Sequence, residues 1–288
     1  MSLSHTFPGK TAAPLAVRLA ALLSACAVAA LLGFLIYFCL PLLRGDALSQ
    51  LLGMDWRPFQ GKFGILPMLA GSLALALAAV PLAFPVAVGV CCFIHGAGPD
   101  RAGRVVLRAV KLMTGVPTVV YGFVGVFLLV PLLRAAFRHG SGFSWLAAVA
   151  GLVVLILPTM ILMIHSQFQL AGPRVRMAAT ALGLSRAQQL VHLVLPLSRR
   201  GFVAALVLGF GRAVGDTMLP LMLSGNAPQI PGSPLDSIRA LTSHIALVVA
   251  TDSHSMAYLS LFAAGLFLFM TTAAVTLALR WVRAGEGA

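Results

Sequence analysis

Six long apolar stretches limit what this chain can fold into. They cover residues 17–43, 64–94, 110–133, 145–170, 201–225 and 255–282. A helix that crosses the ~30 Å hydrocarbon core of a bilayer needs about 20 such residues. Charged residues make up only 9% of the chain, whereas a soluble domain carries roughly 25%. The sequence therefore predicts an all-α integral membrane protein with six transmembrane helices, in one domain over residues 17–288 behind a tail of residues 1–16.

Lysine and arginine are divided unevenly between the connections of these stretches. Thirteen of the twenty lie near the two termini and in the second and fourth connections, whereas six lie in the other connections. The more basic side of a membrane protein faces the cytoplasm. The sequence thus predicts cytoplasmic N- and C-termini and a cytoplasmic loop over residues 173–200. Because this topology accounts for the net charge of +13, binding to nucleic acid is not expected.

Residue types that commonly bind metals are scattered along the chain. The four cysteines lie within apolar stretches and form no Cys-x-x-Cys pair, as is typical of thiols that pack as small hydrophobic groups. Asp252 and His254 lie close together in the connection over residues 226–254. Two such residues without a third ligand do not define a metal site. We therefore expect no bound metal and no bound cofactor in this chain.

Helix-breaking residues interrupt three of the apolar stretches. They are Pro81 and Pro85 in the second, Gly115 and Pro117 in the third, and Pro158 in the fourth. Breaks inside a membrane are tolerated where other helices or a water-filled cavity satisfy the freed backbone groups. This pattern is typical of a helix bundle around a transport path, although proline is also commoner in membrane helices than in soluble ones. The connections over residues 44–63 and 226–254 each have room for a short helix on the membrane surface.

The loop over residues 173–200 carries its own folding signals. Pro173 favours the first turn of a helix, and Gly183 is typical of the position just after a helix ends. Ser185 and Gln188 have the spacing of a capping box, which predicts a second short helix to about Val191, and Pro196 ends the unit. The small residues Ala178, Ala179 and Ala181 give the first helix a smooth face. Such a face suits docking to another protein; the alternative is a helix pair that packs only on lipid headgroups.

Two charged residues lie inside the fifth apolar stretch. Arg212 lies eleven residues beyond Gly201, near the middle of the membrane, and Asp216 follows four residues later, where the two side chains can meet on one helix. A charge at this depth costs at least about 2.5 kcal/mol, so it is by default a functional hypothesis. Arg212 would attract an anion in transit and Asp216 would hold the arginine in place, with Thr217 and Thr118 as hydroxyl donors. A purely structural bridge between helices is the alternative.

The loop resembles the coupling loop of ABC importer permeases. That family has the pattern E-A-A-x-x-x-G followed by an aliphatic-x-Leu-Pro segment, and this chain has the corresponding residues at the same spacing, namely Met177, Ala178, Ala179, Gly183, Leu193, Leu195 and Pro196. The resemblance implies a type I importer fold in which this loop docks onto an ATP-binding subunit. The usual glutamate is Met177 here, which removes one charged contact from the expected interface.

The charged stretch and the third apolar stretch resemble oxyanion permeases. The family segment R-A-x-G-E corresponds to residues 212–216, with Asp216 in place of glutamate, and GVPTVVYGFVGVFLLVPLLR (115–134) and RALTSHIAL (239–247) are also similar. The resemblance covers most of the chain from about residue 60 and is greatest to the phosphate type, the Pst permeases of the PstC kind. It implies that Arg212, Asp216, Thr217 and Thr118 line a substrate pathway.

The resemblance also implies an assembly in the bacterial inner (plasma) membrane. The expected partners are a second permease, which would form a heterodimer with this one, two ATP-binding subunits that bind ATP and magnesium, and an extracytoplasmic binding protein. This chain would then be a transport subunit and not an enzyme. The alternatives are a sulfate or molybdate permease, an ion-coupled secondary transporter, for which a docking unit has no use, and a membrane enzyme built on His165 and His192.

Overall fold

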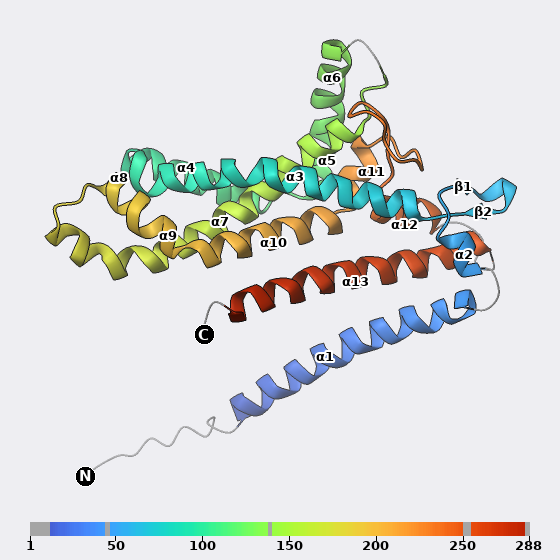
Figure 1. Ribbon diagram of the computed structural model, residues 1–288, viewed down its shortest axis with the longest axis horizontal. Helices are drawn as coiled ribbons and strands as arrows, with labels where there is room; N and C mark the ends of the chain where they lie inside the picture. The colour runs from blue at the N-terminus through green and yellow to red at the C-terminus, as the bar shows by residue number, and fades with distance from the viewer. Residues whose placement is uncertain (1–11, 44–46, 138–139, 250–254, 286–288) are drawn as a thin grey trace.

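The protein is an elongated bundle of helices with different elements at its two ends (Figure 1). The computed structural model describes residues 12–43, 47–137, 140–249 and 255–285. A short hairpin of β1 (Trp56–Arg57) and β2 (Lys62–Phe63) stands at one end, called here the hairpin end. The short helices α8 (Arg186–Gln189) and α9 (Leu195–Leu197) lie at the opposite end, called the loop end.

Three long helices form the centre of the bundle: α3 (Leu66–Cys92), α7 (Trp145–Ala181) and α10 (Arg199–Gly215). Small residues at helical spacing allow their backbones to approach closely. The buried alanines include Ala76, Ala79, Ala83 and Ala87 on α3, Ala148 on α7 and Ala205 on α10. At Gly209 a Cβ atom would lie only 2.9 Å from Sδ of Met160. The prolines at 81 and 85 lie within α3, which continues through both.

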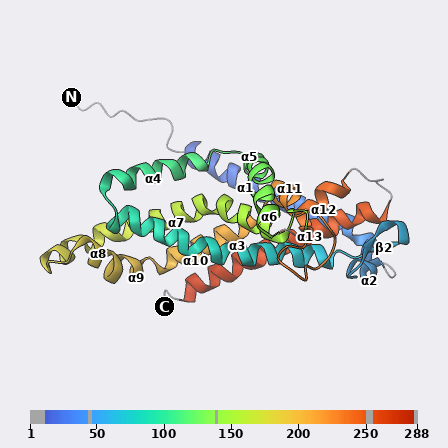
Figure 2. The ribbon, with the colours of Figure 1, turned by 90° about the horizontal axis from the view of Figure 1, so that it is seen from above.

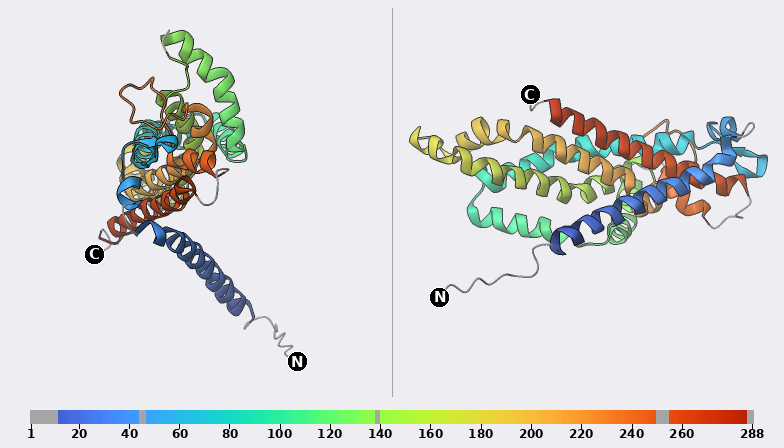
Figure 3. Two further views of the ribbon diagram at one scale, coloured as in Figure 1. Left: turned by 90° about the vertical axis from the view of Figure 1, so that its right-hand side faces the viewer. Right: turned by 90° about the horizontal axis from the view of Figure 1, so that it is seen from below.

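The first and last described helices pack against each other beside this centre. They are α1 (Ala12–Cys39), followed by a 3-10 turn over Leu40–Leu43, and α13 (Met256–Gly285). The ring of Phe262 stacks on that of Phe38, with centroids 4.5 Å apart. Most other side chains of α1 are exposed, and the helix diverges from the bundle toward its N-terminal end (Figure 3). Lipid must cover this apolar surface.

The third apolar stretch is not one helix, contrary to the prediction. A separate amphipathic helix, α4 (Asp100–Met113), precedes it and runs back from the loop end toward the middle of the bundle (Figure 2). The chain then breaks at residues 114–117, and α5 (Thr118–Val124), a π-helical turn (Gly125–Leu129) and α6 (Val130–Phe137) follow. Pro117 has no N–H to continue a helix. Beyond the break the chain turns crosswise to the bundle, and α6 projects from it (Figures 1 and 3).

The connections at the hairpin end contain more structure than the surface helices that were predicted. Residues 47–63 hold the short helix α2 (Ala47–Leu51) and the antiparallel hairpin, in which Trp56 pairs with Phe63. The connection over residues 226–249 is a loop that ends in α12 (Leu241–Val248). Its buried His244 lies edge-on to the ring of Trp56, with centroids 4.3 Å apart. Asp252 and His254 fall outside the described residues.

At the loop end the predicted helix that starts at Pro173 does not exist as a separate element. Instead α7 continues through this position and ends at Ala181. The chain then forms α8, a π-helical turn (Leu190–Val194) and α9, and bends by 68° into α10. Five described segments are long and apolar enough to cross a membrane, and one of them, Thr118–Phe137, consists of α5, the π-helical turn and α6 together. α10 meets the same criteria only jointly with the bent segment of α8 and α9 that precedes it. The chain is therefore a multi-pass membrane protein, as predicted.

Candidate functional site

The fifth apolar stretch is broken where its acidic residue lies. α10 ends at Gly215, Asp216 has extended backbone angles (φ −74°, ψ 131°), and the next helix, α11, covers Met218–Leu223. The single helix predicted over residues 201–225 is therefore wrong. The break leaves backbone groups free of helical hydrogen bonds, and inside a membrane such groups need partners from elsewhere in the protein.

Asp216 supplies some of these partners itself. Its Oδ2 atom accepts a hydrogen bond of 2.9 Å from the backbone N–H of Leu219, which caps the first turn of α11. Its backbone carbonyl accepts a hydrogen bond of 2.9 Å from the hydroxyl of Thr242 on α12. Asp216 therefore ties the start of α11 to α12, and its carboxylate acts as a helix cap.

Arg212 bonds to a different helix. Its Nη1 atom donates to Oγ1 of Thr159 on α7 at 3.2 Å, and the side chain is half-buried. The ion pairs within the described residues are Lys62–Asp55 and Arg186–Asp100, so the expected bridge between Arg212 and Asp216 does not form. Asp216 still donates its backbone N–H to the carbonyl of Arg212 at 3.1 Å, but its carboxylate turns to the N–H of Leu219 while Arg212 turns to Thr159. The guanidinium charge is thus held by a neutral hydroxyl in the membrane-spanning region.

The two predicted threonines lie on either side of a helix–helix contact. Thr217 precedes α11 and makes no side-chain capping bond, and Thr118 is the first residue of α5; both are half-buried. α5 and α11 pack together, and a Cβ atom at Gly122 would lie only 2.5 Å from Sδ of Met222. The structure therefore brings together the two short helices that follow the two breaks.

The connection over residues 226–249, at the hairpin end, joins the break to α3. The sequence had not indicated a functional role for this connection. Ile238 donates its backbone N–H to the carbonyl of Ser224 at 2.9 Å. Arg239 donates from Nε to the carbonyl of Asn226 at 2.8 Å. The backbone N–H of Leu241 donates to Oγ of Ser72 on α3 at 2.7 Å. These bonds join residues up to 169 positions apart, and no short motif reveals such pairings.

The coupling unit, residues 177–196, has two local motifs. Gly183 has a φ of +68°, Leu184 N–H donates to the carbonyl of Ala179 at 3.0 Å, and Gly183 N–H donates to that of Thr180 at 3.1 Å. These are the two bonds of a Schellman motif, which confirms the predicted helix end at glycine. The capping box between Ser185 and Gln188 is also present, with both of its reciprocal hydrogen bonds.

The expected docking face of the coupling unit is largely exposed. Met177 is 83% exposed, and Ala178, Ala181 and Pro196 also lie on the surface. Ala179 is fully buried and Leu195 is half-buried. Small exposed residues beside exposed apolar ones, such as Leu182, offer a surface on which another protein can pack.

The coupling unit contacts the bundle through the turn that follows α3. Arg186 forms an ion pair of 2.8 Å with Asp100 at the start of α4, and a Cβ atom at Gly96 would lie 2.9 Å from the side chain of Leu190. Nε2 of His95 lies 2.8 Å from Nδ1 of His165 on α7. His95 borders a cavity of about 540 Å³ that is also lined by Arg186 and Gln189 of α8. His165 therefore pairs with His95, whereas the sequence had grouped it with His192.

Comparison with known proteins identifies the family. Residues 96–284 match the family described as binding-protein-dependent transport system inner membrane component. This range includes α4, both breaks, the coupling unit and nearly all of α13. The chain belongs to this family of ABC importer permease subunits, and it is therefore a transport subunit, as the sequence predicted.

Individual permease proteins are similar to this chain over most of its length. The chain is 31% identical to a probable ABC transporter permease protein of Bacillus subtilis, YqgH, over 81% of this chain and 76% of the relative. It is 29% identical to the phosphate transport system permease protein PstC of Xylella fastidiosa, over 81% and 78% of the two chains. The corresponding protein of Pasteurella multocida is 27% identical over 77% and 75%.

Proposed function

We propose that this chain is a permease subunit that moves inorganic phosphate across the bacterial inner membrane. The observation that carries the proposal is Arg212, a half-buried cation in a broken membrane span that bonds to Thr159 and to no described carboxylate. An anion that crosses a medium of low dielectric constant needs compensating charge, and intramembrane arginines commonly mark such pathways. The PstC relatives support phosphate as the anion.

Each predicted pathway residue has a distinct part in this proposal. Arg212 attracts the phosphate, and the hydroxyls of Thr217 and Thr118 donate hydrogen bonds to its oxygens. Asp216 fixes the geometry of the break through Leu219 and Thr242. Because its carboxylate lies near Arg212 without forming an ion pair with it, the donor groups of the guanidinium remain available to the substrate, and release depends on movement of the helices.

That movement would come from partner subunits. Two ATP-binding subunits, which hold ATP and magnesium, dock on the exposed face of the coupling unit around Met177 and Ala178 on the cytoplasmic side. A second permease completes the pathway as a heterodimer, and an extracytoplasmic binding protein delivers phosphate at the hairpin end. The family description, which names binding-protein-dependent transport, supports this arrangement. Both termini would then be cytoplasmic.

A reconstituted transport assay tests the proposal. The chain would be purified with its partner subunits, placed in proteoliposomes, and supplied with ATP and with labelled phosphate, sulfate or molybdate. We expect ATP-dependent uptake of phosphate in preference to the other two anions. Preferred uptake of sulfate or molybdate would identify the alternative permease type. Ion-gradient-driven uptake by the chain without ATP-binding subunits would instead identify a secondary transporter.

A further inference from the structure

A second arginine lies at the hairpin end, apart from the break. Arg239 is half-buried, just before α12. Within the described residues its guanidinium makes one hydrogen bond, from Nε to the carbonyl of Asn226 at 2.8 Å. Its backbone carbonyl lies so close to α3 that a Cβ atom at Gly71 would approach it to 2.5 Å. The arginine is therefore fixed against the bundle, and its two terminal nitrogens have no hydrogen-bond partner among the residues that the structure describes.

No described acidic side chain pairs with this arginine. Both ion pairs of the described residues lie elsewhere, and the carboxylate of nearby Asp236 accepts the backbone N–H groups of Gly232 and Ser233 at 2.9 and 2.8 Å. Burial lowers the pKa of Arg239. The pKa of His244 falls to about 3, chiefly through burial and then through the charge of Arg239. An uncompensated, partly desolvated cation of this kind is stabilised by an incoming anion.

Polar groups around Arg239 also lack partners. The buried Oγ of Ser224, whose carbonyl accepts the N–H of Ile238, has no hydrogen bond within the described residues and could donate to an anion. The Oδ1 of Asn226 also has no described partner, but as an acceptor it needs water or another donor. Buried polar atoms are rarely left without a partner unless they serve a ligand or hold water. Thr242, three residues after Arg239, donates to the carbonyl of Asp216. The connection that carries Arg239 is thus bonded directly to the break that follows Arg212.

We propose that Arg239 is the capture residue for a tetrahedral oxyanion at the hairpin end, from which the anion passes to Arg212. The inference rests on the proposed function, which supplies the direction of transport. A guanidinium offers a planar set of donors that matches two oxygens of a phosphate or sulfate group. A half-buried cation at the entrance raises the local concentration of anions and so increases the fraction that enters after delivery.

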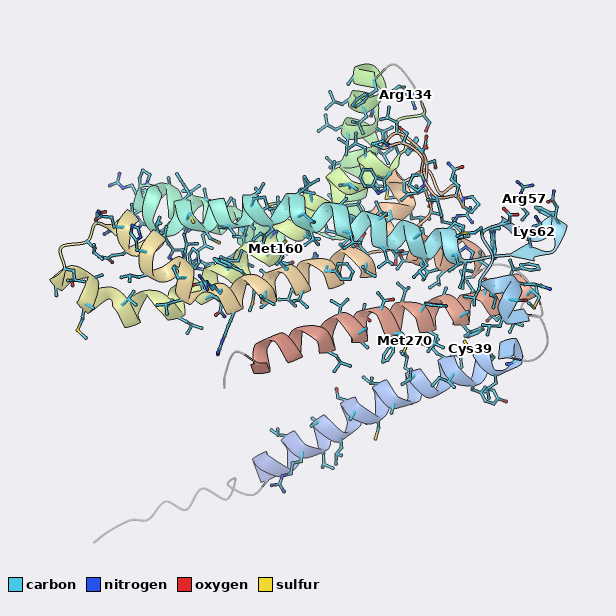
Figure 4. The ribbon with its side chains drawn as sticks, in the orientation of Figure 1. Cys39, Arg57, Lys62, Arg134, Met160 and Met270 are labelled. Atoms are coloured by element: carbon cyan, nitrogen blue, oxygen red, sulfur yellow. The ribbon has the colours of Figure 1, made fainter. Side chains whose placement is uncertain are left out.

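The chain offers a matched control. Arg134 on α6 also bonds to a backbone carbonyl, donating from Nε and Nη2 to Ser141 at 3.1 and 2.6 Å, but its side chain is exposed. Arg134, Arg57 and Lys62 all lie on projecting segments, on α6 and on the hairpin (Figure 4). If Arg239 served only to brace the carbonyl of Asn226, the effect of its replacement would not depend on whether the new side chain carries a charge. Arg134 shows the effect of removing an exposed arginine that bonds to a carbonyl.

The test uses the complete complex in proteoliposomes, supplied with labelled phosphate and the loaded binding protein. It measures the number of anions transported per ATP hydrolysed. Arg239→Gln retains an N–H donor for Asn226 but removes the charge, whereas Arg239→Lys retains the charge. We expect Arg239→Gln to lower the ratio about tenfold, since charge-assisted hydrogen bonds contribute at least this factor. Arg239→Lys should recover most of it and Arg134→Gln should not change it. Impaired assembly would lower ATP hydrolysis and anion transport together, so it would not change the ratio of the two.

An unchanged ratio in Arg239→Gln would overturn the inference. So would an Arg239→Lys ratio as low as that of Arg239→Gln, because loss independent of charge indicates a brace. Failure of the proposed function gives a different result, since the unmodified complex would then not take up phosphate. If the unmodified complex transports sulfate instead, the same ratios measured with sulfate still decide the role of Arg239.

Discussion

The coupling unit and the broken fifth span lie in adjacent parts of the chain, yet they are held together in different ways. In the coupling unit the defining hydrogen bonds join residues three to five positions apart, as in the capping box and the Schellman motif. At the break they join residues up to 53 positions apart, as between Arg212 and Thr159. The motifs of the coupling unit are therefore set by local bonds, although Leu190 and Val194 also pack into the core, whereas the bonds of the break exist only in the assembled bundle.

The largest effect is expected for a variant at the break, which should impair transport but leave docking at the coupling unit intact. Arg212→Ala should reduce phosphate uptake about 100-fold, because a cation that contacts an anion in a dry pathway contributes more than a neutral hydrogen bond. Co-purification with the ATP-binding subunits should be unchanged, because the docking face lies in the other region. Thr159→Val, which removes only the partner hydroxyl, should cause a smaller loss. Normal uptake by Arg212→Ala would remove the break from the proposed pathway.

The next prediction concerns the long-range contacts at the hairpin end. Gly71→Ala places a methyl group 2.5 Å from the carbonyl of Arg239. Backbone must move to relieve this clash, so the variant should lose about 2 kcal/mol of unfolding free energy. Thermal unfolding in detergent measures the loss. Gly89→Ala on the same helix is the control, because nothing lies within 4 Å of the added Cβ atom and stability should hold or rise. Equal melting temperatures for both variants would contradict the close approach.

A glycine in the coupling unit should behave differently. Gly183→Ala imposes a left-handed backbone on alanine, at a cost of about 1 kcal/mol. Because the strain is local, amide hydrogen exchange should accelerate over residues 179–189 while the melting temperature of the bundle stays constant. Gly183→Asn should show a milder change, since asparagine tolerates this conformation. A lower melting temperature of the whole protein would show that the coupling unit is not independent.

The smallest effect is expected at the exposed ion pair of the hairpin. A hydrogen bond from Lys62 and its charge lower the pKa of Asp55. The pair therefore contributes stability above the ordinary pKa of an aspartate, and this contribution is lost as the pH falls through the lowered pKa. Lys62→Met should have melting temperatures close to those of the unmodified protein at pH 7, and any difference should vanish in acid. A large difference at pH 7 would show that the pair supports more than the hairpin.

Local signals explain what the sequence could predict about the fold. Apolar length alone identified the membrane spans, and Gly183, Ser185 and Gln188 located the helix end and the capping box because these motifs involve close neighbours. Gly115 and Pro117 indicated a break in the third stretch, but they did not indicate that the chain turns crosswise to the bundle there. The continuation of α7 through Pro173 differs from the prediction, because a proline inside a long helix is tolerated where other groups satisfy the freed backbone carbonyl.

The candidate site was predicted in its residues but not in its geometry. Arg212 and Asp216 stand out because charges are costly in a membrane, whereas their partners Thr159 and Thr242 carry no such signal. The break itself depends on Asp216 as a cap for α11 and on Thr242 of α12, which donates a hydrogen bond to the carbonyl of Asp216. This is a tertiary arrangement. Arg239 was counted only as one of the basic residues of its side of the membrane. That no acidic side chain of the described residues pairs with it depends on how the loop packs against α3, which the sequence does not indicate.

The pairing of α1 with α13 sets an order for biogenesis. In the order of the chain α1 precedes every other described helix, yet the helix against which it packs is the last. During synthesis α1 must remain in the bilayer while the central helices insert and settle beside it. Most described side chains of α1 are apolar and not covered by protein. Lipid can therefore solvate the helix before α13 is present. The stacking of Phe38 on Phe262 can form only after α13, the last described helix, has been synthesised.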